Sequence, residues 1–306
     1  MHTVLIATDK PFAKVAVNGI SEIIKNAGFE LKLLEKYTTK EQLLEAIKDV
    51  DAVIVRSDII DEEVIKAAGK LKIAVRAGAG YDNIDLKAAS AKGVVVMNTP
   101  GQNANAVAEL AFGSMIFLNR NFYSGTSGVE LRGKTLGIHA YGHIGRIVAR
   151  IARGFGMDVF GHDPFVDKVV IENDGVKHVP VAEDLYRKCQ YISVNLPANK
   201  ETKESINFDL LNLMPEGATL VNTARKEIID EPSLLKMYAE RKDFRYVTDV
   251  APDCQEQIKT DYAARYYATP KKMGAQTEEA NINAGLAAAR QIVNFLTKGD
   301  KTFQVN

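Results

Sequence analysis

The sequence has little of what marks secreted, membrane-bound or nucleic-acid-binding proteins. Its 306 residues include only two cysteines, Cys189 and Cys254, which are too few for a disulfide framework and fit a reducing cytoplasm. Lysine plus arginine and aspartate plus glutamate both number 39, so net charge favours neither a nucleic acid nor an anionic membrane as partner. No apolar run is long enough for a secretory signal or a membrane span. We therefore expect a cytoplasmic protein with no membrane or nucleic-acid partner and no metal.

A chain of this length is expected to form roughly two domains, each with its own core. Short β-branched runs alternate with stretches of helical periodicity in the first third of the sequence. Such runs are typical of buried parallel strands, and the helical stretches tend to end in glycine. The expected strands are residues 3–7, 31–34, 51–57, 71–80 and 94–99. The expected helices are residues 20–28, 41–50, 61–69 and 85–93.

A second alternating series follows a long helical stretch at residues 103–120. The sequence therefore predicts an α/β protein of two doubly wound parallel sheets, with a cleft between the two units. The expected strands of the second series are residues 135–140, 157–163, 191–197, 218–225 and 244–250. The expected helices include residues 143–156 and the last helix, residues 277–299.

A dinucleotide-binding fingerprint lies at the first strand-to-helix turn of the second series. The turn reads Ala140-Tyr-Gly142-His143-Ile144-Gly145, and Asp163 ends the next strand. Glycines let the backbone approach a pyrophosphate at the helix N-terminus, and the acid hydrogen-bonds a ribose diol. The acid would repel an additional phosphate, so NAD is favoured over NADP. Ala140 departs from the pattern because glycine is usual there, where a positive φ is often needed.

Five blocks, in this order, resemble those of the D-isomer-specific 2-hydroxyacid dehydrogenases, and within that family the phosphoglycerate dehydrogenases. They are RAGAGYDNID (76–85), NANAVAELAF (103–112), ELRGKTLGI (130–138), LVNTARKEIIDE (220–231) and GAQTEEA (274–280). The resemblance implies a flavodoxin-like substrate-binding domain of residues 1–98 plus 282–306. A Rossmann NAD-binding domain of residues 99–281 would be inserted into it.

The resemblance also implies two catalytic residues. Arg225 matches an arginine that holds the substrate carboxylate and carbonyl oxygen. Lys272 stands where the family has a catalytic histidine, and it becomes the candidate acid/base. A free lysine has a pKa of about 10.4, so this role needs surroundings that favour the neutral amine, such as burial near other cations. The alternative is that Lys271 and Lys272 are simply two solvated surface lysines.

The glutamate that accompanies the family histidine is also absent. Cys254 stands at its position, with Asp253 and Glu256 nearby. A lysine needs no carboxylate to fix a tautomer, so the two changes are chemically coherent. Which of the three residues, if any, takes over the role of the glutamate stays open. A nucleophilic role for Cys254 is disfavoured because hydride transfer needs none.

Residues at the carboxyl ends of two strands of the first series are the candidate substrate ligands. The resemblance implies that backbone N–H groups of Gly78, Ala79 and Gly80 grip the substrate carboxylate as a small nest. Arg56 suits a substrate phosphate, with Ser57 beside it and Arg76 on the next strand. The alternative for Arg56 is an ion pair with Asp58 or Asp61.

Further coenzyme contacts follow from the resemblance. Those expected near the adenine and ribose are Leu196, Pro197 and Thr202. Those expected near the nicotinamide are Thr223, Ala224 and Asp249, with Asp249 accepting a hydrogen bond from the carboxamide, and Gly274 and Ala275 are also expected to contact the coenzyme.

The function that the resemblance implies is NAD-dependent oxidation of 3-phosphoglycerate to 3-phosphohydroxypyruvate, the first step of serine biosynthesis. Within the same class, the alternative is a reductase for glyoxylate, hydroxypyruvate or a D-lactate-type acid. Outside it, the alternative is a non-catalytic protein that senses NADH. We also expect a homodimer through the cofactor domain, with the apolar helix at 108–120 in the interface.

Overall fold

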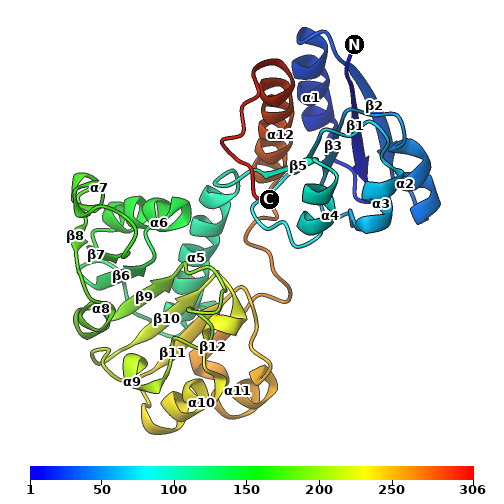
Figure 1. Ribbon diagram of the computed structural model, residues 1–306. Coiled ribbons are helices and arrows are strands. Elements are labelled where there is room, and N and C mark those ends of the chain that lie inside the picture. Colours follow the sequence, from blue (N-terminus) through cyan, green and yellow to red (C-terminus); the bar gives the residue numbers. More distant parts are fainter. The chain divides into compact units, whose positions relative to one another are not determined.

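The computed structural model describes residues 1–306, which form two compact units. Unit 1 comprises Met1–Asn103 and Gln276–Asn306, and unit 2 comprises Ala104–Ala275. The chain therefore passes between the units a few residues from the boundaries that the resemblance implied, after residues 98 and 281. Figure 1 shows the helices and strands of both units.

Unit 1 is built on a parallel five-stranded sheet in the order β2-β1-β3-β4-β5. This is the flavodoxin-like strand order. The strands are β1 (Thr3–Thr8), β2 (Glu30–Glu35), β3 (Ala52–Val55), β4 (Ile73–Arg76) and β5 (Val95–Asn98). The helices are α1 (Lys14–Asn26), α2 (Lys40–Ala46), α3 (Glu62–Ala67), α4 (Leu86–Ala91) and α12 (Glu278–Lys298).

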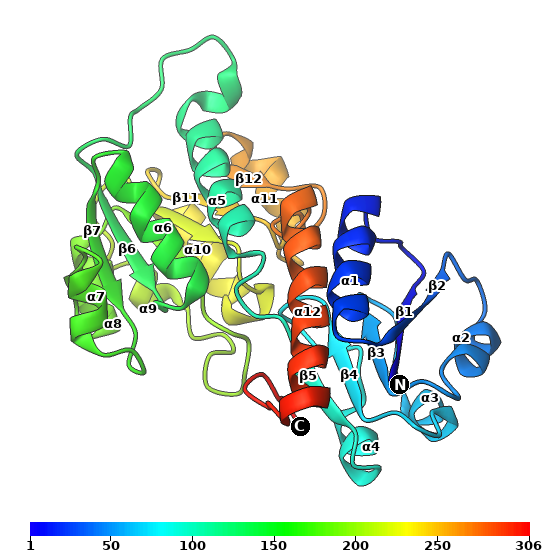
Figure 2. The ribbon, with the colours of Figure 1, turned by 90° about the horizontal axis from the view of Figure 1, so that it is seen from above.

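Both faces of the unit 1 sheet are covered, which explains its continuous apolar strands. All four residues of β3 are buried. Helices α1 and α12 lie side by side (Figures 1 and 2) and pack their apolar residues against one face of the sheet. Helices α2, α3 and α4 supply the core on the other face. One helical layer of unit 1 therefore combines a helix from each end of the chain.

Unit 2 contains a parallel seven-stranded sheet in the order β12-β11-β10-β9-β6-β7-β8. Strand order reverses at β6, as in Rossmann folds, so the predicted α/β class with two parallel sheets is confirmed. The strands are β6 (Thr135–His139), β7 (Asp158–His162), β8 (Lys177–His178), β9 (Tyr191–Val194), β10 (Thr219–Asn222), β11 (Arg245–Thr248) and β12 (Tyr266–Ala268). The short edge strands β8 and β12 were not expected from the sequence.

Helices cover both faces of this sheet. They are α5 (Ala104–Asn119), α6 (His143–Gly154), α7 (Lys168–Asn173), α8 (Ala182–Lys188), α9 (Phe208–Leu211), α10 (Glu231–Glu240) and α11 (Gln255–Tyr262), with 3₁₀ turns at Asn121–Tyr123, Lys226–Ile228 and Ala263–Arg265. Phe112, Met115 and Leu118 of α5 are buried in the core of unit 2 itself. Packing within the unit therefore accounts for much of the apolar character of α5. None of the helices combines the length and apolarity that crossing a bilayer requires.

Candidate functional site

The glycine turn of unit 2 joins β6 to α6. Ala140 has φ +75°, so the position usually taken by glycine does adopt the left-handed conformation here. Helix α6 follows, with Gly142 as its N-cap. A Cβ on Gly145 would lie 2.5 Å from the carbonyl oxygen of Ala140, so only glycine fits there. The first N–H groups of α6 have no partner within the helix and form a positive pole suited to a phosphate.

Asp163 is fixed beside this turn by two backbone hydrogen bonds. One carboxylate oxygen accepts from the N–H of Tyr141 at 2.8 Å, and the other accepts from the N–H of Phe165 at 2.8 Å. Tyr141 is itself buried, and its hydroxyl donates to Asp174 at 3.1 Å. The structure thus brings the acid at the end of β7 to the turn after β6, which is the geometry that a ribose diol requires.

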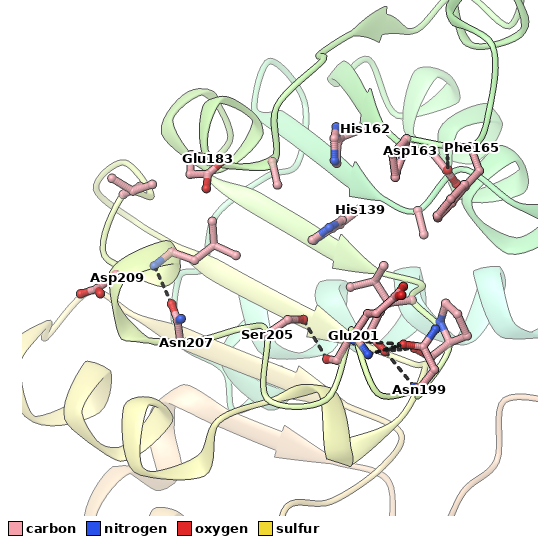
Figure 3. Close-up of a pocket in the computed structure, with 18 of the residues that line it drawn as sticks. His139, His162, Asp163, Phe165, Glu183, Asn199, Glu201, Ser205, Asn207 and Asp209 are labelled. Atoms are coloured by element: carbon pink, nitrogen blue, oxygen red, sulfur yellow. Dashed lines mark hydrogen bonds between the residues drawn. The ribbon is translucent and has the colours of Figure 1, made fainter.

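A pocket of about 700 Å³ opens at the carboxyl ends of β6, β7 and β9 (Figure 3). It lies where the strand order of the sheet reverses, the usual ligand crevice of open α/β sheets. Of the predicted coenzyme residues, Asp163, Leu196, Pro197 and Thr202 line it. The Thr202 hydroxyl donates to the carbonyl of Pro197 at 2.5 Å, so it shapes the loop that forms one wall.

Two histidines that the sequence analysis did not single out form the floor of this pocket. His139 ends β6 and His162 ends β7, with ring centroids 5.6 Å apart (Figure 3). Nδ1 of His139 lies 3.1 Å from the hydroxyl of Tyr186. Burial, with a smaller contribution from His162, lowers the pKa of His139 to about 4, so its ring is neutral at physiological pH. The sequence signal was a histidine at the end of each of two adjacent strands.

Phe165 is a further lining residue that the sequence analysis missed. It lies two residues after Asp163 along the chain, and it is 91% exposed. A large aromatic ring this exposed on a pocket rim is suited to stacking on a planar ligand.

The turn after β10 carries Arg225. Buried Asn222 fixes this turn, because its amide donates to the carbonyl of Arg225 at 2.9 Å and accepts from the N–H of Ala224 at 3.0 Å. Thr223 and Ala224 are buried beneath it. The guanidinium of Arg225 donates to the carbonyl of Ala224 at 2.9 Å and has no carboxylate partner. Its positive charge is therefore available to an anionic group.

The turn after β11 carries Asp249, which organises the loop with the two lysines. Asp249 is 2% exposed. Its carboxylate accepts from the hydroxyl of Thr269 at 2.7 Å and from the N–H groups of Met273 and Gly274 at 2.7 and 2.8 Å. These contacts hold residues 269–274 in place. Asp249 therefore has a structural role in addition to the predicted one, which is to accept a hydrogen bond from the carboxamide of the coenzyme.

The lysines that this loop carries are on the surface of unit 2. Lys271 and Lys272 are both exposed, Gly274 is buried and Ala275 is half-buried. Burial was expected to help Lys272 lose its proton, but unit 2 does not provide it.

Cys254 and its neighbours are engaged elsewhere in unit 2. Asp253 pairs with Lys226 at 2.5 Å, and Glu256 pairs with Lys259 at 2.9 Å. The N–H groups of Asp253 and Cys254 donate to the carboxylate of Glu231 at 2.7 and 2.9 Å. Burial, together with Glu231, raises the pKa of the Cys254 thiol to about 12. Cys254 therefore stays protonated and is unsuited to nucleophilic attack.

Unit 1 holds Arg56 with neutral acceptors, so the alternative of an ion pair with Asp58 or Asp61 is wrong. The guanidinium donates to the carbonyls of Lys10 and Pro11 at 2.9 and 3.2 Å and to the side-chain oxygen of Asn281 at 2.6 Å. Both carboxylates bind other residues, which the sequence analysis did not consider. Asp58 accepts from Tyr37 at 2.7 Å and Asp61 pairs with Lys40 at 2.7 Å.

The turn after β4 brings Arg76 and the Gly-Ala-Gly segment together. Nε of Arg76 donates to the carbonyl of Arg56 at 3.1 Å. Gly78 has φ +151°, and a Cβ there would lie 1.2 Å from Nη1 of Arg76. The N–H of Gly78 donates to the carbonyl of Arg76 at 2.9 Å, so the predicted nest is reduced to the N–H groups of Ala79 and Gly80.

Ser57 is exposed and does not share the surroundings of the Arg56 guanidinium. It lines a hollow with Asp58 and Lys40. The structure thus groups Arg56 with Arg76, and sets Ser57 apart from them.

Comparison with known proteins gives three close relationships. Residues 105–271 match the family described as D-isomer specific 2-hydroxyacid dehydrogenase, NAD binding domain. A D-3-phosphoglycerate dehydrogenase of Methanocaldococcus jannaschii is 38% identical over 276 residues, which cover 84% of this chain and 52% of that protein. A hydroxypyruvate reductase of Thermotoga maritima is 35% identical over 288 residues, which cover 87% of this chain and 92% of that protein.

Among solved structures, 3-phosphoglycerate dehydrogenase of Entamoeba histolytica with bound NAD⁺ is 51% identical, with a TM-score of 0.86. The match covers 100% of this chain and 98% of that one. By contrast, the chain spans about half the length of the curated D-3-phosphoglycerate dehydrogenase that it matches.

Proposed function

Because the chain belongs to the D-isomer specific 2-hydroxyacid dehydrogenases, an NAD-dependent family, we propose that it oxidises 3-phosphoglycerate to 3-phosphohydroxypyruvate. The observation that carries the choice of substrate is Arg56. This arginine is held in a fixed orientation by carbonyl and amide oxygens, and no carboxylate forms an ion pair with it. A planar guanidinium of this kind suits a phosphate group.

Unit 2 has the features that NAD requires. A pyrophosphate fits the free N–H groups at the start of α6, where Gly145 leaves no room for a side chain. A ribose diol fits the fixed carboxylate of Asp163. The pocket beside them has the apolar walls and the exposed Phe165 that suit an adenine. When bound, NAD supplies the acceptor for the hydride.

In the proposed reaction Arg225 binds the carboxylate and the C2 oxygen of the hydroxyacid. Lys272 accepts the proton of the C2 hydroxyl while the hydrogen on C2 leaves as a hydride, so that C2 becomes a carbonyl. The clamp of Asp249 on Met273 and Gly274 sets the position of the loop that carries Lys272. Unit 2 leaves Lys272 exposed, so the desolvation that favours the neutral amine must come with the bound substrate.

A second candidate is reduction of hydroxypyruvate or a similar small keto acid. It is favoured by one observation, the match over 92% of the length of the Thermotoga maritima hydroxypyruvate reductase. That reaction runs in the opposite direction with the same groups, and it would leave Arg56 without a phosphate to bind.

The test is to follow NADH absorbance with purified protein and a panel of acids with and without phosphate. We expect 3-phosphoglycerate with NAD to give the highest kcat/KM and NADP to be a poor cofactor. Higher kcat/KM with hydroxypyruvate or glyoxylate would favour the second candidate. NADH binding with no turnover of any acid would support a sensing protein and reject both enzymatic proposals.

We further propose that the protein is a cytoplasmic homodimer that associates through unit 2. Support for the compartment comes from Cys189 and Cys254, both free thiols. Exposed aromatic residues such as Tyr123, 64% exposed, lie just after α5 and suit an interface. Sedimentation velocity of the wild type and of Tyr123→Glu tests the dimer, which the variant should weaken.

A further inference from the structure

A second hollow lies at the other end of the unit 2 sheet, where β9, β10 and β11 begin. Its volume is about 230 Å³. Tyr191, Thr219 and Arg245 are the first residues of these three strands, and Lys134 immediately precedes β6. In a parallel sheet all strands start at one edge, so this hollow is separated from the coenzyme pocket by the length of β9, four residues at about 3.3 Å each.

The hollow is strongly cationic. Lys134, Lys242, Arg245 and Arg265 line it, against one acid, Asp243. Asp243 is already neutralised by Arg241, whose Nη2 lies 2.6 Å from its carboxylate. This local excess of positive charge stands out in a chain whose net charge is zero, and it will concentrate anions at this surface.

Three of the four cations have no partner for their charged groups. The side chains of Lys134, Lys242 and Arg245 make no hydrogen bond or ion pair, whereas other lysines of unit 2, such as Lys226, pair with acids. Their positive charges are therefore available to an anion at this surface.

The remaining lining residues form a rigid base for such an anion. The guanidinium of Arg265 donates to the carbonyls of Arg241 and Tyr238 at 2.6 and 2.9 Å. Tyr191 is 4% exposed, and its hydroxyl oxygen accepts from the amide of Asn119 at 2.9 Å. Arg265 and Tyr191 are therefore held in place before any anion binds.

We propose that this hollow is a binding site for a small phosphate-bearing anion, separate from the coenzyme and substrate sites. Arg245 would give the two-pronged contact that phosphate oxygens favour, and Lys134 and Lys242 would act as point charges. The cavity is large enough for a phosphate with a short carbon skeleton but much smaller than the 700 Å³ pocket that takes a nucleotide. The proposal does not depend on the substrate of the enzyme.

The test uses inorganic phosphate as the probe and isothermal titration calorimetry on the full chain. Saturating NADH occupies the coenzyme site, and an Arg56→Ala background removes the proposed substrate phosphate site. Ionic strength is held constant with sodium chloride. Arg245→Met and Lys134→Met remove cations from the hollow, and Lys188→Met removes an exposed lysine of unit 2 outside it.

We expect saturable phosphate binding that Arg245→Met weakens roughly ten- to hundredfold, as for the loss of a charged hydrogen bond. Lys134→Met should weaken it less, and Lys188→Met should leave it unchanged. Absence of saturable binding, or equal losses in all three variants, would overturn the proposal. Thermal unfolding shows that the variants are folded, and phosphate should raise Tm in the Arg56→Ala background but not after Arg245→Met is added.

Discussion

The two units fix charged groups at the ends of their strands in opposite ways. In unit 1 the cation Arg56 is held by neutral oxygens of Lys10, Pro11 and Asn281. In unit 2 the carboxylate of Asp249 holds a loop by accepting hydrogen bonds from Thr269 and two backbone N–H groups. The charge of Arg56 is thus kept for a ligand, whereas the charge of Asp249 positions other residues.

This difference suggests a division of labour. Unit 1 would determine which acid binds, and unit 2 would bind the coenzyme and carry the reacting lysine. Mutations in unit 1 should then change KM for the substrate, whereas mutations in the clamped loop of unit 2 should change kcat.

The largest effect is expected for Lys272→Ala. Loss of a general acid/base lowers turnover by roughly two to four powers of ten, and NAD affinity should stay near that of the wild type. Steady-state kinetics and an NADH titration measure the two quantities. Lys271→Ala is the matched control, since it removes an adjacent exposed lysine. If Lys271→Ala is the more damaging variant, or if both retain full activity, the lysines are a solvated pair.

The next effect concerns stability and pH. Burial lowers the pKa of His139 from 6.5 to about 4, so between these values the unfolded chain binds a proton that the folded chain does not. The free energy of unfolding is therefore unaffected by this group above pH 6.5. It decreases as the pH falls from 6.5 toward 4, by about 3 kcal/mol at most.

Urea unfolding of unit 2 at pH 7 and pH 5 measures this loss. His139→Gln should unfold with a weaker pH dependence than the wild type. His143→Gln, which replaces an exposed histidine, should keep the wild-type dependence. Identical profiles for His139→Gln and the wild type would show that protonation of His139 does not limit stability.

A moderate effect is expected for Arg56→Ala in unit 1. Loss of a charged hydrogen bond to phosphate costs about 1.5–3 kcal/mol, so KM for the phosphorylated acid should rise roughly ten- to hundredfold. KM for an unphosphorylated analogue should change little. Asn281→Ala removes one of the oxygens that orient the guanidinium, at 2.6 Å, and should give a smaller rise of the same kind. A fall in kcat with unchanged KM would break the division between the units.

The smallest effect compares two turns. Unit 1 uses Gly78 at φ +151°, whereas unit 2 places Ala140 at φ +75°. Replacing Ala140 by glycine relieves a left-handed alanine and should stabilise unit 2 by about 0.5–1 kcal/mol. Gly78→Ala should destabilise unit 1, because residues with a side chain rarely adopt this φ and the new Cβ would displace the guanidinium of Arg76. Thermal unfolding measures whether Tm rises for Ala140→Gly and falls for Gly78→Ala. A lower Tm for Ala140→Gly would show that the left-handed conformation of Ala140 is not strained.

The sequence predicted the sheets well because their interior strands are short apolar runs with both faces covered. β3 is the clearest case, with four consecutive buried residues. The edge strands β8 and β12 span two and three residues, too few for any periodicity to mark them. Their formation depends on the neighbouring strand rather than on their own composition.

The candidate site was predictable where one short segment carries it. The turn at residues 140–145 and Asp163 form such a segment. Contacts between distant segments could not be predicted, and Arg56 lies 225 positions from Asn281. A nearby acid was the alternative partner considered for Arg56, but Tyr37 and Lys40 engage Asp58 and Asp61 instead. Competition for partners of this kind is decided by the tertiary structure.

The α1–α12 pair bears on how the chain folds as it is synthesised. Unit 2 is continuous, from Ala104 to Ala275, whereas the sheet of unit 1 receives α12 only after those residues have been made. Until then, apolar residues such as Ile20, Ile54 and Val75, which pack in the same core cluster as α12, lack part of their cover. Contacts this remote in sequence form slowly. The amino-terminal unit, although its strands are made first, can therefore complete its core only after all of unit 2 has been synthesised.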